Sequence, residues 1–62
     1  MGNTFTDSSG DTFGTNVELG PLGDEVIDFT LTYEGSANTD GVISFFKADA
    51  TKIIALIAEA AK

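Results

Sequence analysis

The sequence predicts a small α+β fold, with an antiparallel β-sheet, a C-terminal apolar helix and an extended Gly/Thr-rich N-terminal arm. Residues 25–34 alternate strictly between apolar and polar side chains, which is the period of a half-buried strand. Residues 49–61 are rich in Ala, Ile and Leu, a composition that favours helix. Residues 1–24 hold five of the seven glycines and the only proline, which is typical of turns and extended segments.

The strand at 25–34 is the clearest element. Its apolar positions are Ile27, Phe29, Leu31 and Tyr33, and its polar positions are Asp28, Thr30, Thr32 and Glu34. Successive side chains of a strand point to opposite faces of the sheet. We therefore expect one face to meet the core and the other to meet solvent.

A second strand is predicted at 41–47, although this segment has two interpretations. The turn-rich "GSANTDG" before it ends in Asp-Gly, which suits a hairpin, and "VISFF" is rich in strand-forming residues. In the alternative, a single helix runs from about 39 to 61. Its apolar stripe would be Ile43, Phe46, Ala50, Ile53, Ile57 and Ala60, at spacings of three and four.

The C-terminal helix, at about 49–61, is apolar on more than one side. Asp49 is the predicted N-cap, because its carboxylate would lie near the positive end of the helix dipole. A stripe of Ile53, Ile57 and Ala60 can face the sheet, while Ile54, Leu56 and Ala58 point elsewhere. So short a chain cannot enclose such a helix, so we expect a partner to cover the rest.

The chain is expected to divide into a flexible or docking arm, 1–24, and a small α+β domain, 25–62. Two similar segments, "TFTD" and "TFGT", flank the turn-like "SSGD", so a loose hairpin is the alternative interpretation of the arm. The segment "NVEL" at 16–19 could form a short strand. In the arm interpretation, Phe5 and Phe13 dock on another surface.

The composition argues against catalysis and cofactor binding. The 62 residues contain no Cys and no His, which removes disulfides, thiolates, the commonest metal ligand and the commonest general base. The loop "SANTDG" matches three positions of a calcium-binding EF-hand loop, but Ser36 and Lys47 replace the first and last acidic ligands. We expect this loop to be an ordinary turn. We also expect the protein to bind no cofactor and no metal and to have no enzymatic activity.

Charge excludes two classes of partner. Ten acidic residues against three lysines give a net charge of −7, and the lysines all lie in the last sixteen residues. Nucleic acids and anionic membranes both require cationic surfaces, so neither is an expected partner. The polar start and the longest apolar run, Ile53 to Ala58, predict neither a secretory signal nor a transmembrane segment. "MGNTFT" fits the short N-myristoylation pattern at Gly2, without the basic patch that stable anchoring needs. Localisation is otherwise unknown from the sequence.

These observations predict a non-enzymatic structural or assembly protein. It would be a small repeated subunit of a multi-chain particle, a homo-oligomer or part of a larger host assembly, similar in size and composition to virion decoration or cement proteins. A virion is the location that this interpretation implies. The alternative is an acidic protein-binding module or inhibitor of a basic protein. The predicted partner interface comprises Phe5, Phe13, Phe45, Ile54, Leu56 and Ile57.

Overall fold

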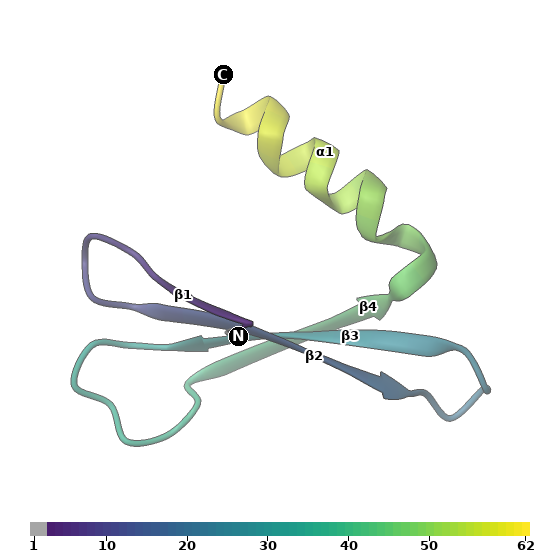
Figure 1. Cartoon of the computed structure of the whole chain (residues 1–62), viewed down its shortest axis with the longest axis horizontal. Coiled ribbons are helices and arrows are strands. Elements are labelled where there is room, and N and C mark those ends of the chain that lie inside the picture. Colours follow the sequence, from purple (N-terminus) through teal and green to yellow (C-terminus); the bar gives the residue numbers. More distant parts are fainter. Residues whose placement is uncertain (1–2) are drawn as a thin grey trace.

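The computed structural model describes residues 3–62 and shows a four-stranded antiparallel sheet followed by one α-helix (Figure 1). The strands are β1 (Thr4–Thr6), β2 (Thr12–Leu19), β3 (Glu25–Thr32) and β4 (Gly41–Phe46). One 3-10 turn, η1 (Lys47–Asp49), leads into the helix α1 (Ala50–Ala60). The α+β class, both predicted strands and the C-terminal helix are confirmed. The alternative of one helix from about 39 to 61 is wrong.

The sheet is a simple meander in the order β1-β2-β3-β4, so each strand pairs with its neighbour in the sequence. The turn between β1 and β2 is built around the carboxylate of Asp7, whose Oδ1 accepts hydrogen bonds from the backbone N–H groups of Ser9 and Asp11. Gly10 in this turn has φ of 91°, a conformation that side-chain-bearing residues rarely adopt. Short turns of this kind keep consecutive strands adjacent.

The register of the strands gives the sheet two chemically different faces. On one face, Ile27 of β3 lies between Val17 of β2 and Phe45 of β4. On the other face, Asp28 lies between Asn16 and Ser44, and the Ser44 hydroxyl donates a 2.6 Å hydrogen bond to Asp28. The alternation predicted for β3 thus extends across the sheet. We call the first side the apolar face; it carries Phe5, Phe13, Thr15, Val17, Ile27, Phe29, Leu31, Ile43 and Phe45.

The N-terminal segment differs from the extended or flexible arm predicted for 1–24. Residues 12–19 form β2, an inner strand that pairs with β3 along its whole length, and β1 adds a short outer strand. Phe13 of β2 stacks on Phe29 of β3 with ring centroids 5.8 Å apart. The hairpin alternative is therefore the right one, because backbone pairing and this aromatic contact join the segment to the rest of the sheet. Gly2, with its myristoylation pattern, lies outside the described residues.

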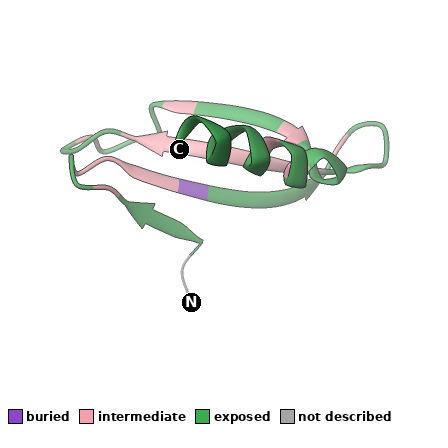
Figure 2. Ribbon diagram, turned by 90° about the horizontal axis from the view of Figure 1, so that it is seen from above, coloured by how far each residue is buried: buried purple, intermediate pink, exposed green. Residues whose placement is uncertain are grey.

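The helix lies above the apolar face, as Figure 2 shows from above, but it covers that face incompletely. Among residues 3–62 no hydrophobic side chain is buried, and Gly14 of β2 is the one buried residue. Asp49 occupies the N-cap position as predicted, but its side chain makes no capping hydrogen bond. The reason is local: the preceding 3-10 turn gives Asp49 αR backbone angles instead of the extended conformation that capping needs.

Candidate protein-interaction surface

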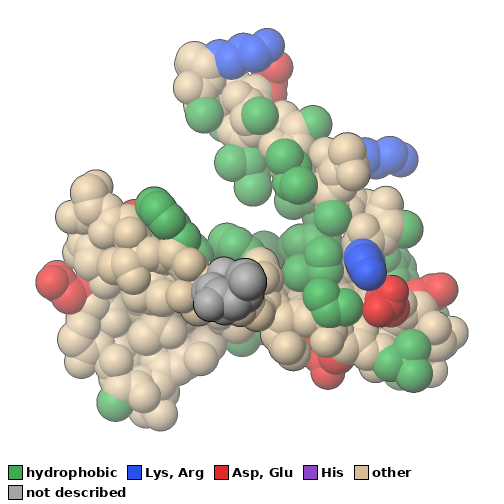
Figure 3. Space-filling model, in the orientation of Figure 1, with side chains coloured by type: hydrophobic (Ala, Val, Ile, Leu, Met, Phe, Trp, Pro, Cys, Tyr) green, Lys and Arg blue, Asp and Glu red, His purple; other side chains and the backbone are tan. Residues whose placement is uncertain are grey.

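An apolar groove separates α1 from the sheet. From η1 the helix rises at an angle over the sheet, and the space-filling view shows hydrophobic side chains on both sides of the resulting hollow (Figures 1 and 3). The groove encloses about 250 Å³. Its lining consists of Thr15, Ile27, Phe29, Ile43, Phe45, Ala50, Ile53, Ile54 and Ile57. No charged side chain is among them, so the groove suits an apolar occupant.

The groove is open to solvent rather than closed into a core. Ile43 on the sheet is 62% exposed, and Ile54 and Ile57 on the helix are 64% and 63% exposed. A well-packed core residue would contact neighbours on all sides. The two layers approach each other near η1 but do not seal the space between them, which leaves most of this apolar area available for contact with another molecule.

The six residues predicted as a partner interface occupy three places. Phe45, Ile54 and Ile57 line the groove. Phe5 and Phe13 lie farther along the apolar face, where they border a second hollow of about 250 Å³. Leu56 lies outside the groove and is 72% exposed, on the flank of α1. All of these residues except Leu56 therefore lie on the apolar face of the sheet or on the side of α1 that faces it. Their binding to a partner stays a prediction.

Several groove residues were missing from the predicted interface. The strict alternation of β3 predicts a core position for Ile27 and Phe29, because such alternation normally marks a buried face. The sequence pattern predicts that Ile43 and Ile53 belong to apolar stripes, and it gives them no role in binding. The signal that could have found them is the shortness of the chain, since one helix and one sheet of this size leave much of their apolar surface open.

The edge of β4 is the second notable surface. β4 is an outer strand, so the backbone groups on its free side have no strand partner among residues 3–62. Its six residues, "GVISFF", carry no charge and no proline. Val42 and Phe46 are 56% and 46% exposed. The opposite edge is formed by β1, which is only three residues long, and beyond it by residues 16–19 of β2, which β1 does not reach.

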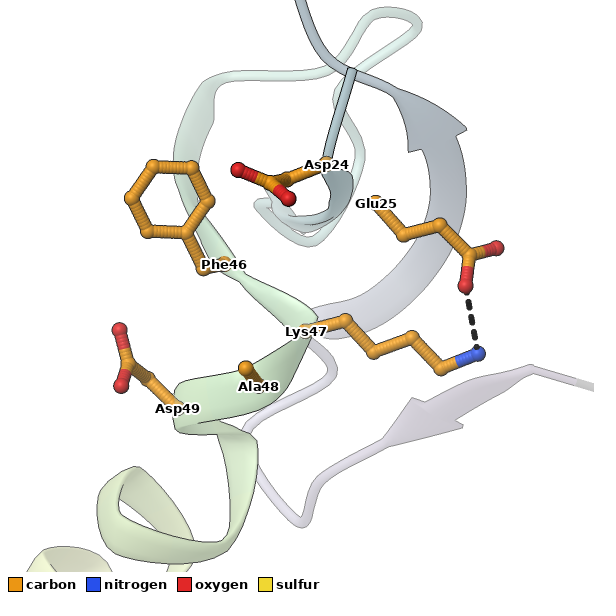
Figure 4. Close-up of a pocket in the computed structure, with 6 residues that line it drawn as sticks. All are labelled: Asp24, Glu25, Phe46, Lys47, Ala48 and Asp49. Carbon is orange, nitrogen blue, oxygen red and sulfur yellow. Dashed lines mark hydrogen bonds and ion pairs between the residues drawn. The ribbon is translucent and has the colours of Figure 1, made fainter. Parts of the chain in front are cut away.

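A wider hollow at the η1 end of the sheet has a different chemistry (Figure 4). It encloses about 640 Å³ and is lined by Asp24, Glu25, Phe46, Lys47, Ala48 and Asp49. Lys47 and Glu25 point toward each other, with 3.2 Å between Nζ and Oε1, and both side chains are more than half exposed. An ion pair so accessible to water contributes little to stability. The ion pair engages Glu25, which directly follows Asp24 in the sequence.

The carboxylates of the polar face influence one another. Hydrogen bonding to Asp28 and the negative charge of that residue raise the pKa of Glu18 above its ordinary value. Hydrogen bonds from Glu18, Ser44 and Asn16 lower the pKa of Asp28. Glu18 is exposed to solvent and Asp28 is half-buried. Their interaction makes this face sensitive to pH without forming a catalytic cleft.

The loop between β3 and β4 is organised by hydrogen bonds within the chain. The carboxylate of Asp40 accepts bonds from the backbone N–H of Tyr33, at 2.8 Å, and from the hydroxyl of Ser36, at 3.2 Å. Both carboxylate oxygens are therefore used in shaping the turn. Within residues 3–62, no three acidic side chains come together in a group that could hold a metal ion.

Comparison with known proteins adds no functional assignment. No protein-family model, no curated protein and no solved structure matches this chain. Over the described part of the chain, no helix has the length and apolar character needed to cross a membrane.

Proposed function

We propose that this protein is a non-enzymatic structural protein that serves as a small repeated subunit of a multi-chain assembly. The observation that carries the proposal is the open apolar groove, because a folded chain with exposed isoleucines on facing surfaces has a strong tendency to associate. Copies of the chain, or a larger host scaffold, would complete the burial that one chain leaves unfinished.

The energetics support association. Full burial of an isoleucine side chain contributes about 1.5–3 kcal/mol of favourable free energy. Ile43, Ile54 and Ile57 are each more than 60% exposed in the single chain. A stable interface buries about 800 Å² on each partner, which is roughly one-sixth of the 4879 Å² surface of this chain. The groove, the flank of α1 and the hollow beside Phe5 together offer an apolar surface suited to such an interface.

The physical type of the chain supports a particle subunit in preference to a signalling domain. It is short, acidic and free of Cys, and its described residues form a sheet and a helix without a closed core. Virion decoration or cement proteins have the same character, since a scaffold supplies part of their stability. A virion is accordingly the location that we propose.

Leu56→Asp tests this function. Leu56 lies on the flank of α1 and does not line the groove, so a charge there should leave the chain folded while it weakens association. Ala55→Asp is the matched control, because it adds the same charge to an exposed position on another side of the same helix. Multi-angle light scattering gives the molar mass, and circular dichroism gives the helix content.

We expect the wild-type chain and Ala55→Asp to exceed the 6.4 kDa of one chain, and Leu56→Asp to shift toward that mass with its helix retained. A wild-type chain that stays monomeric at every concentration and melts sharply would contradict the proposal. A one-to-one complex with a basic protein, weakened by salt, would instead favour an acidic inhibitor.

A further inference from the structure

We propose that β4 pairs antiparallel with β4 of a second copy, so that two four-stranded sheets join into one sheet of eight strands. This inference rests on the proposed assembly function and names both the contact and the partner. It is carried by the edge of β4 itself and by the charges at its two ends.

The edge of β4 has none of the features that normally prevent strands from pairing. An outer strand offers unpaired N–H and C=O groups, and natural sheets block them with charged side chains, proline, bulges or very short strands. β4 has six residues with no charge and no proline. The other edge is interrupted: β1 has only three residues and is followed directly by Asp7, and the part of β2 that β1 leaves unpaired, residues 16–19, carries Glu18.

Charge selects a second copy in antiparallel orientation. With a net charge of −7, two copies repel each other over most of their surfaces, whereas β4 is neutral. Asp40 stands directly before β4 and Lys47 directly after it. Antiparallel pairing of β4 with itself brings Asp40 and the partner's Lys47 to the same end of the strand pair, whereas parallel pairing would bring like charges together. With Ser44 opposite Ser44, Lys47 lies opposite the partner's Gly41, next to Asp40, and keeps its ion pair with Glu25 of its own chain.

The pairing also joins the apolar faces. A two-fold axis perpendicular to the sheet keeps the apolar face of both copies on one side, where both α1 helices lie. A register with Ser44 opposite its own copy places Ile43 beside the partner's Phe45 on that face. Val42 then lies beside the partner's Phe46 on the other face. Apolar side chains therefore lie beside apolar side chains across the new strand pair.

Engineered cysteines test the contact directly, since the natural chain has none. In Ser44→Cys the two sulfurs would face each other across the strand pair, within the 4.5–5.5 Å Cα separation that suits a disulfide. Mild oxidation should convert most of this variant into a covalent dimer. Thr4→Cys on β1 is the control and should cross-link at least tenfold more slowly.

A lysine at the edge gives a second, independent test. Val42 and Thr4 lie at the two ends of one cross-strand row on the polar face, Thr4–Gly14–Thr30–Val42. We expect Val42→Lys to weaken dimerisation at least tenfold in sedimentation equilibrium, and Thr4→Lys to leave it unchanged. Circular dichroism checks that both variants remain folded.

The outcomes separate this inference from the proposed function. If Val42→Lys still associates like wild type and Ser44→Cys fails to cross-link, while Leu56→Asp dissociates, the chains meet through the helix; the edge contact is then wrong and the assembly function stands. If the wild-type chain is a 6.4 kDa monomer at all concentrations, both are overturned.

Discussion

Phe5 and Phe13 lie opposite each other across β1 and β2, yet their surroundings differ. Phe5 is 67% exposed, whereas Phe13 is half-buried and stacks on Phe29. Both were predicted to dock on a partner from a separate arm. In the structure, Phe13 holds β2 against β3, and only Phe5 remains largely free for contact with another molecule.

Replacing each of these rings by alanine should separate the two roles. Phe13→Ala removes a stacked, half-buried ring and should lower the free energy of unfolding by about 2 kcal/mol. Phe5→Ala should lower it by less than about 1 kcal/mol in the dissociated chain, because an exposed ring loses little on truncation. Urea titration at low protein concentration measures both. Equal losses would show that Phe5 packs as tightly as Phe13.

Glu18 gives the protein a pH-dependent contribution to stability. Because its pKa is raised in the folded state, its protonated form is the one that folding favours. This contribution is fully present below the ordinary pKa of glutamate and is lost as the pH rises through the raised value. Asp28 behaves in the opposite way: its pKa is lowered, so its contribution holds above its ordinary pKa and is lost as the pH falls through the lowered value.

Glu18→Gln should therefore stabilise the protein at neutral pH. The amide keeps a hydrogen-bond donor for Asp28 and removes the repulsion between two carboxylates. The melting temperature of the variant should exceed that of wild type at about pH 7, and the gain should shrink toward about pH 4, where Glu18 is protonated. Glu34→Gln, at the other end of the sheet, is the control. A gain that is equal at both pH values would assign the effect to net charge.

At the scale of the elements, strong local patterns predicted β3, β4 and α1. Strict alternation identified β3, the Asp-Gly turn favoured β4, and an Ala-rich composition identified α1. β2 was largely missed because its pattern is weak. Thr15 stands at an apolar-face position, and Gly14 interrupts the strand with a residue of low strand propensity.

The presence of glycine at position 14 is explained by a tertiary contact, which the local sequence pattern does not show. A Cβ atom at this position would lie 2.8 Å from the Thr30 hydroxyl oxygen on the neighbouring strand.

The groove was equally hard to predict: the sequence indicated which side of α1 is apolar, but not the angle at which η1 directs the helix over the sheet. That angle depends on a backbone turn, not on side-chain pattern.

Two deletions test the place of β2 in the fold. Removing residues 2–15 takes away β1 and the half of β2 that contains Phe13, so the sheet should unfold, with loss of its circular dichroism signal. Removing residues 2–6 takes away only β1, and the three remaining strands should persist. Retention of a cooperative melt after the longer deletion would restore the interpretation of this segment as a dispensable arm.

At the scale of the whole molecule, the described chain has two layers and no buried hydrophobic side chain between them. Its stability should therefore depend on association by mass action. We expect the melting temperature to rise by several degrees over a hundredfold increase in protein concentration, and scanning calorimetry measures this. Leu56→Asp should flatten the dependence. A constant melting temperature for the wild-type chain would show that one chain is stable alone.

The meander order of the strands has a kinetic consequence. Because every strand hydrogen-bonds to its neighbour in sequence, each pairing closes only a short loop, and loop-closure entropy stays small at every step. The sheet can form by successive hairpins at a rate that is independent of how many molecules are present. Association of two copies would then follow as a separate bimolecular phase. Newly folded monomers would keep the apolar side of the sheet exposed to solvent until that phase.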